Sequence, residues 1–313
     1  MTTSTSPRIN STNPRINVNG GLIRFLVRMA PAFGRRVSQD LRRRVIVPAK
    51  SPAIEQWTKS GIHAAWIGHS TVLLSIDGFT ILTDPVFSNR IGIRPLGFTI
   101  GFKRLVAPAL AIGKIPAPDL ILLSHAHMDH FDVPSLRKLE SARTSVVTAY
   151  RTSDLLRVPK YKAVHELRWN ESVQIGPVRV QAFEVRHWGA RMRNDAYRGY
   201  NGYLIEAGKY RVVFGGDTAF TDSFKSIRTT KKVDLAIMPI GAYDPWIAAH
   251  CTPEEALAMA DHARAEFVLP VHHRTFQLSR EPDHEPLERL LAAASPSEDR
   301  ICVRDFGGEF QLA

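Results

Sequence analysis

The sequence predicts an α/β fold in which two β-sheets pack against each other and helices cover their outer faces. Each half of the chain contains two β-rich runs separated by a turn signal, followed by a strand and a helix. A repeated pattern of this kind is typical of two similar layers that bury one core. The chain has 313 residues, of which 44% are hydrophobic, so it is long enough for a sizeable core. We find no strong linker between the halves and expect one catalytic domain over residues 51–313.

The first half opens with two β-rich runs, "HAAWIGHS" at 63–70 and "TVLLSIDGFTILTDP" at 71–85. Asp77 and Gly78 divide the second run, and this dipeptide favours a tight hairpin because both positions tolerate positive φ. The first sheet is therefore expected to start with antiparallel strands. Beyond the hairpin we expect a strand, a helix and a second strand, at about 119–124, 134–142 and 145–149.

The second half repeats the pattern. A strand at 178–185 precedes "NGYLIEAGKYRVVFGGD" at 201–217, in which an Ala-Gly pair separates two β-rich runs. A strand at 233–240 then leads into a helix that begins after Thr252. Glu255 follows Thr252 by three residues, which is the spacing of a capping box.

The positive charge of the chain is concentrated at its N-terminus. The net charge is +11, and the first 50 residues, with ten Lys and Arg and one Asp, account for +9 of it. Residues 1–20 are rich in Ser, Thr, Asn and Pro and are expected to form a disordered tail. Residues 21–50 are basic, and 22–33 carry apolar residues at helical spacing, which predicts an amphipathic helix. This helix either docks on the domain through its apolar face or makes peripheral contact with an anionic membrane or an acidic partner.

The composition argues against several classes of protein. The apolar runs are far shorter than the roughly 20 residues of a membrane-spanning helix. The two cysteines, Cys251 and Cys302, are too few for a disulfide framework, so each is expected to be a free thiol in a reducing, cytoplasmic compartment. The nearly neutral domain offers no basic and aromatic face for nucleic acid, and no such partner is expected. The composition neither predicts nor excludes a homo-oligomer.

The stretch "ILLSHAHMDHFDVPSL" at 121–136 places His125, His127, Asp129 and His130 directly after an apolar run. Residues two apart in an extended segment face the same side, so His125 and His127 can bind one cation. Asp129 and His130, expected at the start of the following helix, can reach a second cation. Imidazole and carboxylate are ligand types that suit zinc, iron or manganese.

Three other predicted strands end on a candidate ligand. His187, Asp217 and His272 each follow an apolar strand and precede a loop, and Gly215 and Gly216 would let the backbone approach a metal. Taken singly, a histidine at a strand end is commonly a half-buried group with satisfied hydrogen bonds, and an aspartate after two glycines commonly closes a turn. Their shared position favours a dinuclear metal centre instead.

The order H-x-H-x-D-H, then His, Asp and His, over residues 61 to about 310 resembles the metallo-β-lactamase superfamily. Further stretches resemble the branch that contains N-acylphosphatidylethanolamine-hydrolysing phospholipase D and its bacterial relatives. These stretches are "WIGHSTVLL", "ILTDPVFSNR", "RHW", "FGGDTAF", "VDLAIMPIGAYDPW", "HCTPEEA" and "VHHRTF". The resemblance implies a four-layer αβ/βα sandwich with the metals at one edge.

The resemblance also implies how the ligands divide between two metals, with one aspartate shared by both. They are His125, His127 and His187 for the first metal, Asp129, His130 and His272 for the second, and Asp217 for the bridge. Strand phase alone does not choose between His272 and His273, because neighbours on a strand point to opposite sides; the family pattern chooses His272. The chain departs from the phospholipase at Arg274, where the relative has a Trp-Gly pair, and this difference affects the expected substrate specificity or membrane contact.

Two divalent cations, zinc first and iron or manganese as alternatives, would supply hydrolytic chemistry. Cations about 3.5 to 4 Å apart share a water, lower its pKa towards about 7 and hold it as a bridging hydroxide. Asp129 would orient this hydroxide, and His250 would help to protonate the leaving group, with packing at the helix entry as the alternative for His250. His69 and Asp84 are expected to orient ligating imidazoles, with turn roles as the alternative. The remaining candidates beside the metals or the substrate are Trp188 and Tyr243.

The function expected first is metal-dependent hydrolysis of a phosphodiester, in a phospholipid or another small organic molecule. The alternative is a lactone, ester or β-lactam hydrolase that uses the same hydroxide on a carbonyl carbon. A binding module without activity is expected least, because all seven ligand positions are intact.

Overall fold

The structure is a computed structural model that describes residues 43–94, 97–227 and 231–313. The chain divides into two units, Met1–Arg44 and Val45–Ala313, and the fold below is that of the second unit. The predicted disordered tail (1–20) and amphipathic helix (22–33) lie outside the described residues. Among the helices that are described, none is long and apolar enough to cross a membrane.

The first sheet has seven strands in the order β15-β1-β2-β3-β6-β7-β8. The strands from β15 to β3 are antiparallel to their neighbours, and those from β3 to β8 are parallel. The antiparallel start that the sequence predicted is confirmed. The strand bounds are β1 (Ile62–Gly68), β2 (Thr71–Ile76), β3 (Phe79–Thr83), β6 (Leu120–Leu123), β7 (Ser145–Ala149), β8 (Ala163–Leu167) and β15 (Glu309–Leu312).

The second sheet has six strands in the order β14-β13-β12-β11-β10-β9. It repeats the plan of the first, because β9 to β12 are antiparallel and β12 to β14 are parallel. The strand bounds are β9 (Ser172–Ile175), β10 (Val178–Phe183), β11 (Gly202–Ala207), β12 (Tyr210–Phe214), β13 (Val233–Pro239) and β14 (Ala265–Val271).

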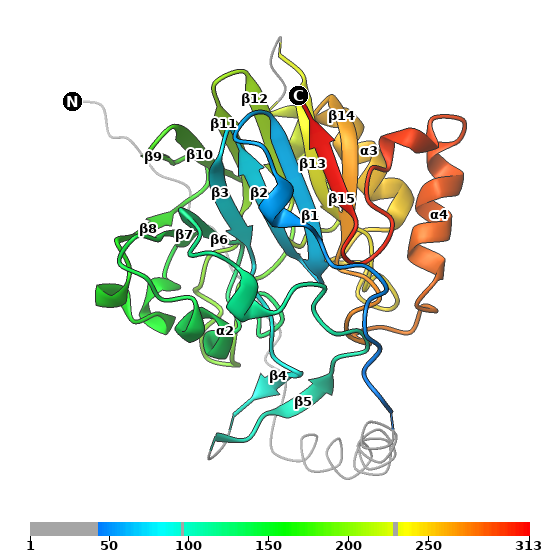
Figure 1. The fold of residues 1–313 in the computed structure, drawn as a ribbon. Coiled ribbons are helices and arrows are strands. Elements are labelled where there is room, and N and C mark those ends of the chain that lie inside the picture. Colours follow the sequence, from blue (N-terminus) through cyan, green and yellow to red (C-terminus); the bar gives the residue numbers. More distant parts are fainter. Residues whose placement is uncertain (1–42, 95–96, 228–230) are drawn as a thin grey trace, which may run out of the picture. The chain divides into compact units, whose positions relative to one another are not determined.

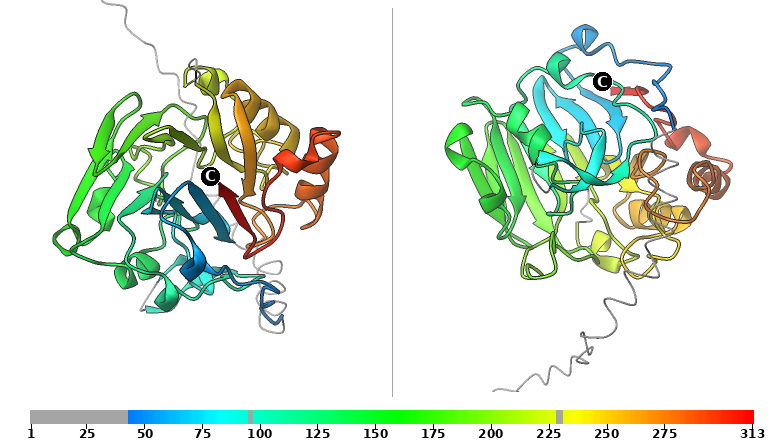
Figure 2. Two further views of the ribbon diagram at one scale, coloured as in Figure 1. Left: turned by 45° about the horizontal axis from the view of Figure 1, so that its top comes forward. Right: turned by 90° about the horizontal axis from the view of Figure 1, so that it is seen from below.

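Three α-helices cover the outer faces of the two sheets: α2 (Val133–Lys138), α3 (Pro253–His262) and α4 (Glu285–Ala294). The largest buried cluster lies between the sheets and combines residues such as Trp66 of β1 with Tyr203 of β11. A second cluster joins the other face of the second sheet to α3 and α4, and a third joins the other face of the first sheet to α2. The unit is therefore a four-layer αβ/βα sandwich, as predicted, and Figures 1 and 2 show α3 and α4 beside β13 and β14.

Short 3-10 turns occupy several of the connections. Their bounds are Ile54–Gln56, Ile112–Lys114, Ser153–Leu155, Val158–Lys160, Asp222–Lys225 and Glu298–Arg300. A separate two-stranded hairpin, β4 (Arg90–Ile93) with β5 (Ile100–Lys103), lies beside the first sheet at its lower end in Figure 1. This hairpin, together with β8, β9, β15 and α4, was not predicted from the sequence.

The turn chemistry that was read from the sequence is confirmed at two places. Asp77 and Gly78 join β2 to β3 with φ of 49° and 82°, as a tight hairpin requires. The N-terminus of α3 carries a complete capping box, in which the Thr252 side chain accepts from the Glu255 N–H and the Glu255 side chain accepts from the Thr252 N–H. The predicted helix at 134–142 is shorter than expected: α2 ends at Lys138, and a turn at Ser141 returns the chain to β7.

We expect Thr252→Ala to lower the free energy of unfolding by about 1 kcal/mol, because it removes the hydroxyl that caps α3. Urea unfolding followed by circular dichroism measures this change. Thr252→Ser keeps the hydroxyl and serves as the control, which should unfold close to the wild-type midpoint. Equal destabilisation by both variants would mean that packing of the threonine methyl, rather than capping, stabilises the helix.

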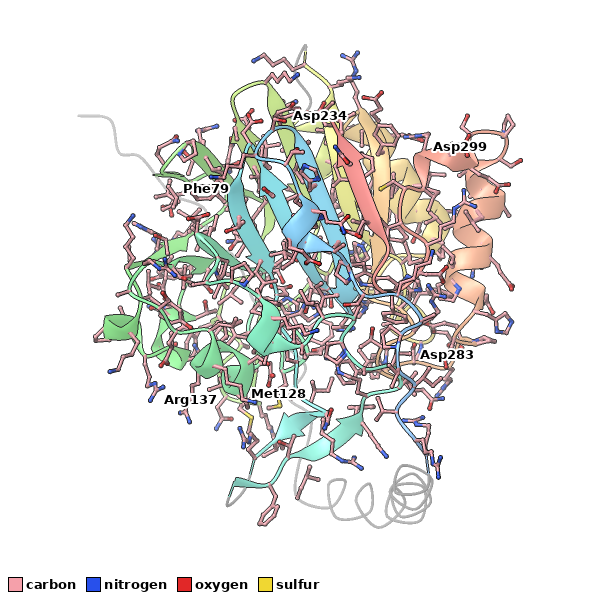
Figure 3. All side chains as sticks on the ribbon, in the orientation of Figure 1. Phe79, Met128, Arg137, Asp234, Asp283 and Asp299 are labelled. Atoms are coloured by element: carbon pink, nitrogen blue, oxygen red, sulfur yellow. The ribbon has the colours of Figure 1, made fainter. Side chains whose placement is uncertain are left out.

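The strand directions bring the carboxyl ends of several strands to one edge of the sandwich. β1, β3 and β6 run in one direction in the first sheet, as do β10, β12, β13 and β14 in the second. Figure 3 shows this polarity: Phe79 and Asp234, near the starts of β3 and β13, lie at the edge opposite to Met128, which follows β6. Residues that follow these strands can therefore meet at a single site.

Candidate metal centre

The seven side chains predicted as metal ligands converge at the edge where these strands end. The four residues of the histidine-rich motif follow β6, one residue follows β10, one follows β12 and one follows β14. In that order they are His125, His127, Asp129 and His130, then His187, Asp217 and His272.

Three histidines form the first group of candidate ligands. The Nδ1 atom of His127 lies 2.8 Å from Nε2 of His125 and 3.3 Å from Nε2 of His187. Asp217 Oδ2 lies 4.0 Å from the same nitrogen of His125 and 3.9 Å from that of His187. The three ring nitrogens thus face a common point, with a carboxylate oxygen beside it.

Asp129, His130 and His272 form the second group. Asp129 Oδ2 lies 3.6 Å from Nε2 of His130 and 3.6 Å from Nε2 of His272. Asp217 Oδ2 is 3.0 Å from the first of these nitrogens and 3.1 Å from the second. The Asp217 carboxylate therefore lies between the two groups, which is the position of a shared ligand.

The hydrogen bonds behind the histidines show which ring nitrogens carry protons. His187 Nδ1 donates to the carbonyl of Ala249 at 2.8 Å, and His130 Nδ1 lies 2.6 Å from the Asp84 carboxylate, to which it donates. The Ser124 hydroxyl donates to Asp84 at 2.5 Å and so accepts from His125 Nδ1 at 2.9 Å. In its neutral form each of the three rings therefore carries its proton on Nδ1 and directs an unprotonated Nε2 into the cluster.

A cation fits this arrangement of acceptors. Unprotonated ring nitrogens and carboxylate oxygens repel one another at these distances unless a positive charge lies among them. His130 Nε2, His272 Nε2 and Asp217 Oδ1 are all buried without a hydrogen-bond partner, and orphaned buried acceptors of this kind are rare. Divalent cations satisfy such imidazole and carboxylate groups at once.

Burial prepares most of the imidazoles for ligation. It lowers the pKa of His125 and His187 well below the usual value for histidine, so both rings are neutral near pH 7. Burial would also lower the pKa of His130, but Asp217 and Asp129 raise it well above the usual value. The pKa of His272 rises to about 9, since the same two carboxylates outweigh its burial. A proton on these two rings occupies the place of a cation, so we expect metal affinity to fall as the pH is lowered.

Asp84 and His69, which the sequence suggested as residues that orient the ligands, both contact candidate ligands. Asp84 is fully buried and accepts from His130 and from both the N–H and the hydroxyl of Ser124. His69 Nε2 lies 3.2 Å from Asp129 Oδ2, and burial lowers the pKa of His69 to about 3. Ser124 was not predicted from the sequence, because a lone serine before a histidine carries no distinctive signal.

The remaining candidates lie at different distances from the cluster. His250 is buried, and its unpartnered Nδ1 lies 3.9 Å from Asp217 Oδ2. Trp188 is 43% exposed, and its ring lies against those of His127 and His187, with centroids 4.6 and 4.5 Å away. Tyr243 instead directs its hydroxyl to Glu285 of α4 at 2.8 Å, so the structure does not bring that hydroxyl into the cluster.

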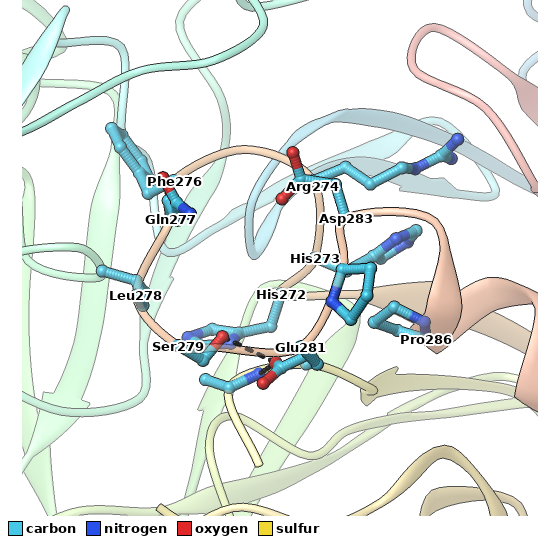
Figure 4. A pocket seen from close by; sticks show the side chains of 13 residues that line it. His272, His273, Arg274, Phe276, Gln277, Leu278, Ser279, Glu281, Asp283 and Pro286 are labelled. Atoms are coloured by element: carbon cyan, nitrogen blue, oxygen red, sulfur yellow. Dashed lines mark hydrogen bonds between the residues drawn. The ribbon is translucent and has the colours of Figure 1, made fainter. Parts of the chain in front are cut away.

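The structure distinguishes the two neighbouring histidines after β14. His272 faces the cluster, whereas the His273 ring stacks on Trp66 with centroids 4.6 Å apart. Arg274 turns away towards the carbonyl of Arg304 and the Asp305 carboxylate. Figure 4 shows His272, His273 and Arg274 on the wall of a small pocket. Arg274, at which the chain departs from the phospholipase pattern, therefore has its charge directed away from the cluster.

One detail of the predicted local structure was wrong. Asp129 and His130 lie in a turn closed by the His130 and Phe131 N–H groups on the His127 carbonyl, and α2 begins only at Val133. Gly216, at φ 58°, also has a close neighbour within the protein. A Cβ there would meet the Ser124 Cβ at 2.8 Å, so the close approach is to the residue that orients His125.

The fold and this cluster define a class of protein: a metal-dependent hydrolase built on an αβ/βα sandwich. A comparison with protein families finds the Beta-lactamase superfamily domain over residues 80–273. The chain belongs to this metallo-β-lactamase superfamily.

Curated relatives support the assignment. An uncharacterized protein of Mycobacterium tuberculosis is 35% identical over 266 residues, which are 82% of this chain and 70% of the relative. N-acyl-phosphatidylethanolamine-hydrolyzing phospholipase D 1 of Caenorhabditis elegans is 28% identical over 77% of this chain and 72% of its own length. The mitochondrial enzyme of that name from Saccharomyces cerevisiae is 31% identical over 80% of this chain and 56% of its own length.

Solved structures show the same fold at low sequence identity. A metallo hydrolase from Ignicoccus hospitalis matches 81% of this chain and 100% of its own, with a TM-score of 0.59 and 19% identity. An isothiocyanate hydrolase from Delia radicum gut bacteria matches 80% of this chain and 99% of its own, with a TM-score of 0.64 and 16% identity.

Proposed function

We propose that this hydrolase is a dinuclear phosphodiesterase that acts on a phospholipid-like or other organic phosphodiester. The observation that carries the proposal is the position of Asp217, whose carboxylate lies between a group of three histidines and a group of one aspartate and two histidines. The similarity to two N-acyl-phosphatidylethanolamine-hydrolyzing phospholipases D supports the choice of a phosphodiester.

In this proposal each group of ligands holds one divalent cation, with zinc as the first candidate. His125, His127 and His187 would hold one, Asp129, His130 and His272 the other, and Asp217 both. When bound, the two cations supply an activated water near neutral pH and neutralise the charge that develops on the substrate. The buried hydrogen bonds from the rings to Asp84, Ser124 and the Ala249 carbonyl hold the ligating nitrogens in place before substrate arrives.

Asp129 and His250 are the two residues to which we assign further roles in the reaction. Asp129 already lies against three imidazoles, so one of its oxygens can bind a cation while the carboxylate orients the attacking water. His250 has a buried Nδ1 without a partner that faces Asp217. Burial lowers the pKa of His250 to about 4, so near pH 7 its neutral ring can hydrogen-bond to substrate.

We expect the metal-loaded protein to hydrolyse bis(4-nitrophenyl) phosphate faster than nitrocefin or an aliphatic lactone. The physical reason is that two adjacent cations stabilise the charge on a phosphoryl group from both sides. The assay compares all three substrates on one preparation of known metal content, and chelation followed by zinc return is the control. Efficient lactone or β-lactam turnover without phosphodiester hydrolysis would overturn the proposal and favour a carbonyl hydrolase.

A further inference from the structure

A pocket of about 450 Å³ lies beside the candidate metal centre, between the β4–β5 hairpin and the start of α2. Its apolar lining includes Ile93, Met128 and Met192. Four arginines from three separate segments of the chain also line it: Arg90 and Arg94 from the hairpin, Arg137 from α2 and Arg191 from the loop after β10. Figure 3 shows Met128 and Arg137 together next to the hairpin.

The positive charge of this pocket is poorly balanced by its own residues. Among the described residues that line the pocket, Asp132 is the one carboxylate. Its Oδ2 accepts from the hydroxyls of Ser88 and Ser135, so it is already engaged. The guanidinium groups of Arg94, Arg137 and Arg191 repel one another, and a bound anion would relieve that repulsion. Guanidinium groups also match phosphate and carboxylate oxygens in geometry.

The pocket is joined directly to the loop that carries the metal ligands. Met128, in its wall, lies in sequence between His127 and Asp129. Arg191 Nη1 donates to the carbonyls of Ala126 and Phe131, at 2.9 and 2.8 Å. These two hydrogen bonds connect Arg191 to both ends of the loop that contains His127, Asp129 and His130. The pocket therefore borders the loop that carries four of the candidate metal ligands.

We infer that this arginine-lined pocket is a second anion subsite, and that the substrate is an organic phosphodiester carrying a further phosphate or carboxylate group. The inference rests on the proposed phosphodiesterase function. The scissile phosphodiester would lie at the metals, and the second anion would lie beside Arg94 and Arg137. Met128 and Met192 offer apolar contact to the atoms that connect the two anions.

Binding of non-hydrolysable phosphonates to the zinc-loaded protein tests the subsite without relying on catalysis. Isothermal titration calorimetry would compare propylphosphonate with alkane bisphosphonates of three to six carbons and with the corresponding phosphonocarboxylates. We expect the best doubly charged compound to bind at least about tenfold more tightly than propylphosphonate, because it gains charge-assisted hydrogen bonds to arginine. The phosphonocarboxylate arm shows whether the second group is phosphate-like or a carboxylate.

The double variant Arg94→Gln/Arg137→Gln should reduce the preference for the doubly charged compound over propylphosphonate to about twofold or less. The affinity for propylphosphonate should stay unchanged. Lys138→Gln/Arg143→Gln is the matched control, because it removes the same charge from two exposed residues outside the pocket lining. If both double variants lost this preference equally, general electrostatics would explain it, and the subsite proposal would be overturned. If propylphosphonate does not bind but the bisphosphonate binds through the two arginines, the phosphodiesterase proposal fails and the subsite stands. If neither compound binds, both fail.

Discussion

Asp217→Asn is expected to abolish the dinuclear centre and to lower metal-dependent hydrolysis by at least about 1,000-fold. One Asp217 oxygen lies within about hydrogen-bonding distance of His130 and His272, at 3.0 and 3.1 Å. The same oxygen lies 3.9 to 4.0 Å from nitrogens of three further histidines, which are His125, His187 and His250. Asparagine keeps the shape but removes the negative charge that two cations would share. The several kcal/mol that metals contribute to transition-state stabilisation correspond to roughly this factor.

Elemental analysis after gel filtration gives the metal content of the Asp217→Asn variant, and hydrolysis is measured on the same preparation. Asp222→Asn is the control: this aspartate lies in the next turn of the same connection, but it is exposed and paired with Lys225 at 2.7 Å. We expect Asp222→Asn to retain full metal content and activity. If Asp217→Asn bound two metals per chain and kept activity within about tenfold, Asp217 would not be the shared ligand.

The position of the candidate ligands could be predicted because the sequence places each of them directly after an apolar strand. Strand direction then determines that His125, His187, Asp217 and His272 meet at one edge. The choice between His272 and His273 could not be made from the strand alone, since a one-residue shift in phase exchanges the two faces. It depended on the family resemblance, and the structure places His273 against Trp66 instead.

The β4–β5 hairpin shows why other parts of the fold escaped prediction. Gly92 and Gly101 lie opposite each other, at φ of 145° and 156°, and a Cβ on either would meet the other strand's backbone near 2 Å. These glycines allow the two strands to approach closely, but glycine also weakens the local signal for a strand. The arginine-lined pocket could not be predicted from the sequence either, because its arginines come from three distant segments.

Asp84 orients two of the candidate ligands, His130 directly and His125 through Ser124. Neither contact involves the Nε2 atoms that face the cluster. Asp84 accepts from His130 Nδ1 and from the Ser124 hydroxyl, which in turn accepts from His125 Nδ1. Both rings are thereby held with Nε2 towards the cluster. The amide of an asparagine at this position would present N–H groups where the carboxylate now accepts. One of the two rings would then shift towards the tautomer that carries its proton on Nε2, and that nitrogen could no longer bind a metal.

We expect Asp84→Asn to weaken zinc binding by about 10- to 100-fold, because positioning residues of this kind contribute that much to metal affinity. The zinc-dependent increase in the free energy of unfolding should fall by about 1.4 to 2.7 kcal/mol at saturating zinc. Competition with a fluorescent chelator gives the affinity, and urea unfolding with and without zinc gives the stabilisation. Asp119→Asn is the matched control, since Asp119 also accepts from an N–H and a hydroxyl, both of Thr80, but at the start of β6. A variant that is destabilised equally with and without zinc, at unchanged zinc affinity, would show that Asp84 supports the fold and does not orient the ligands.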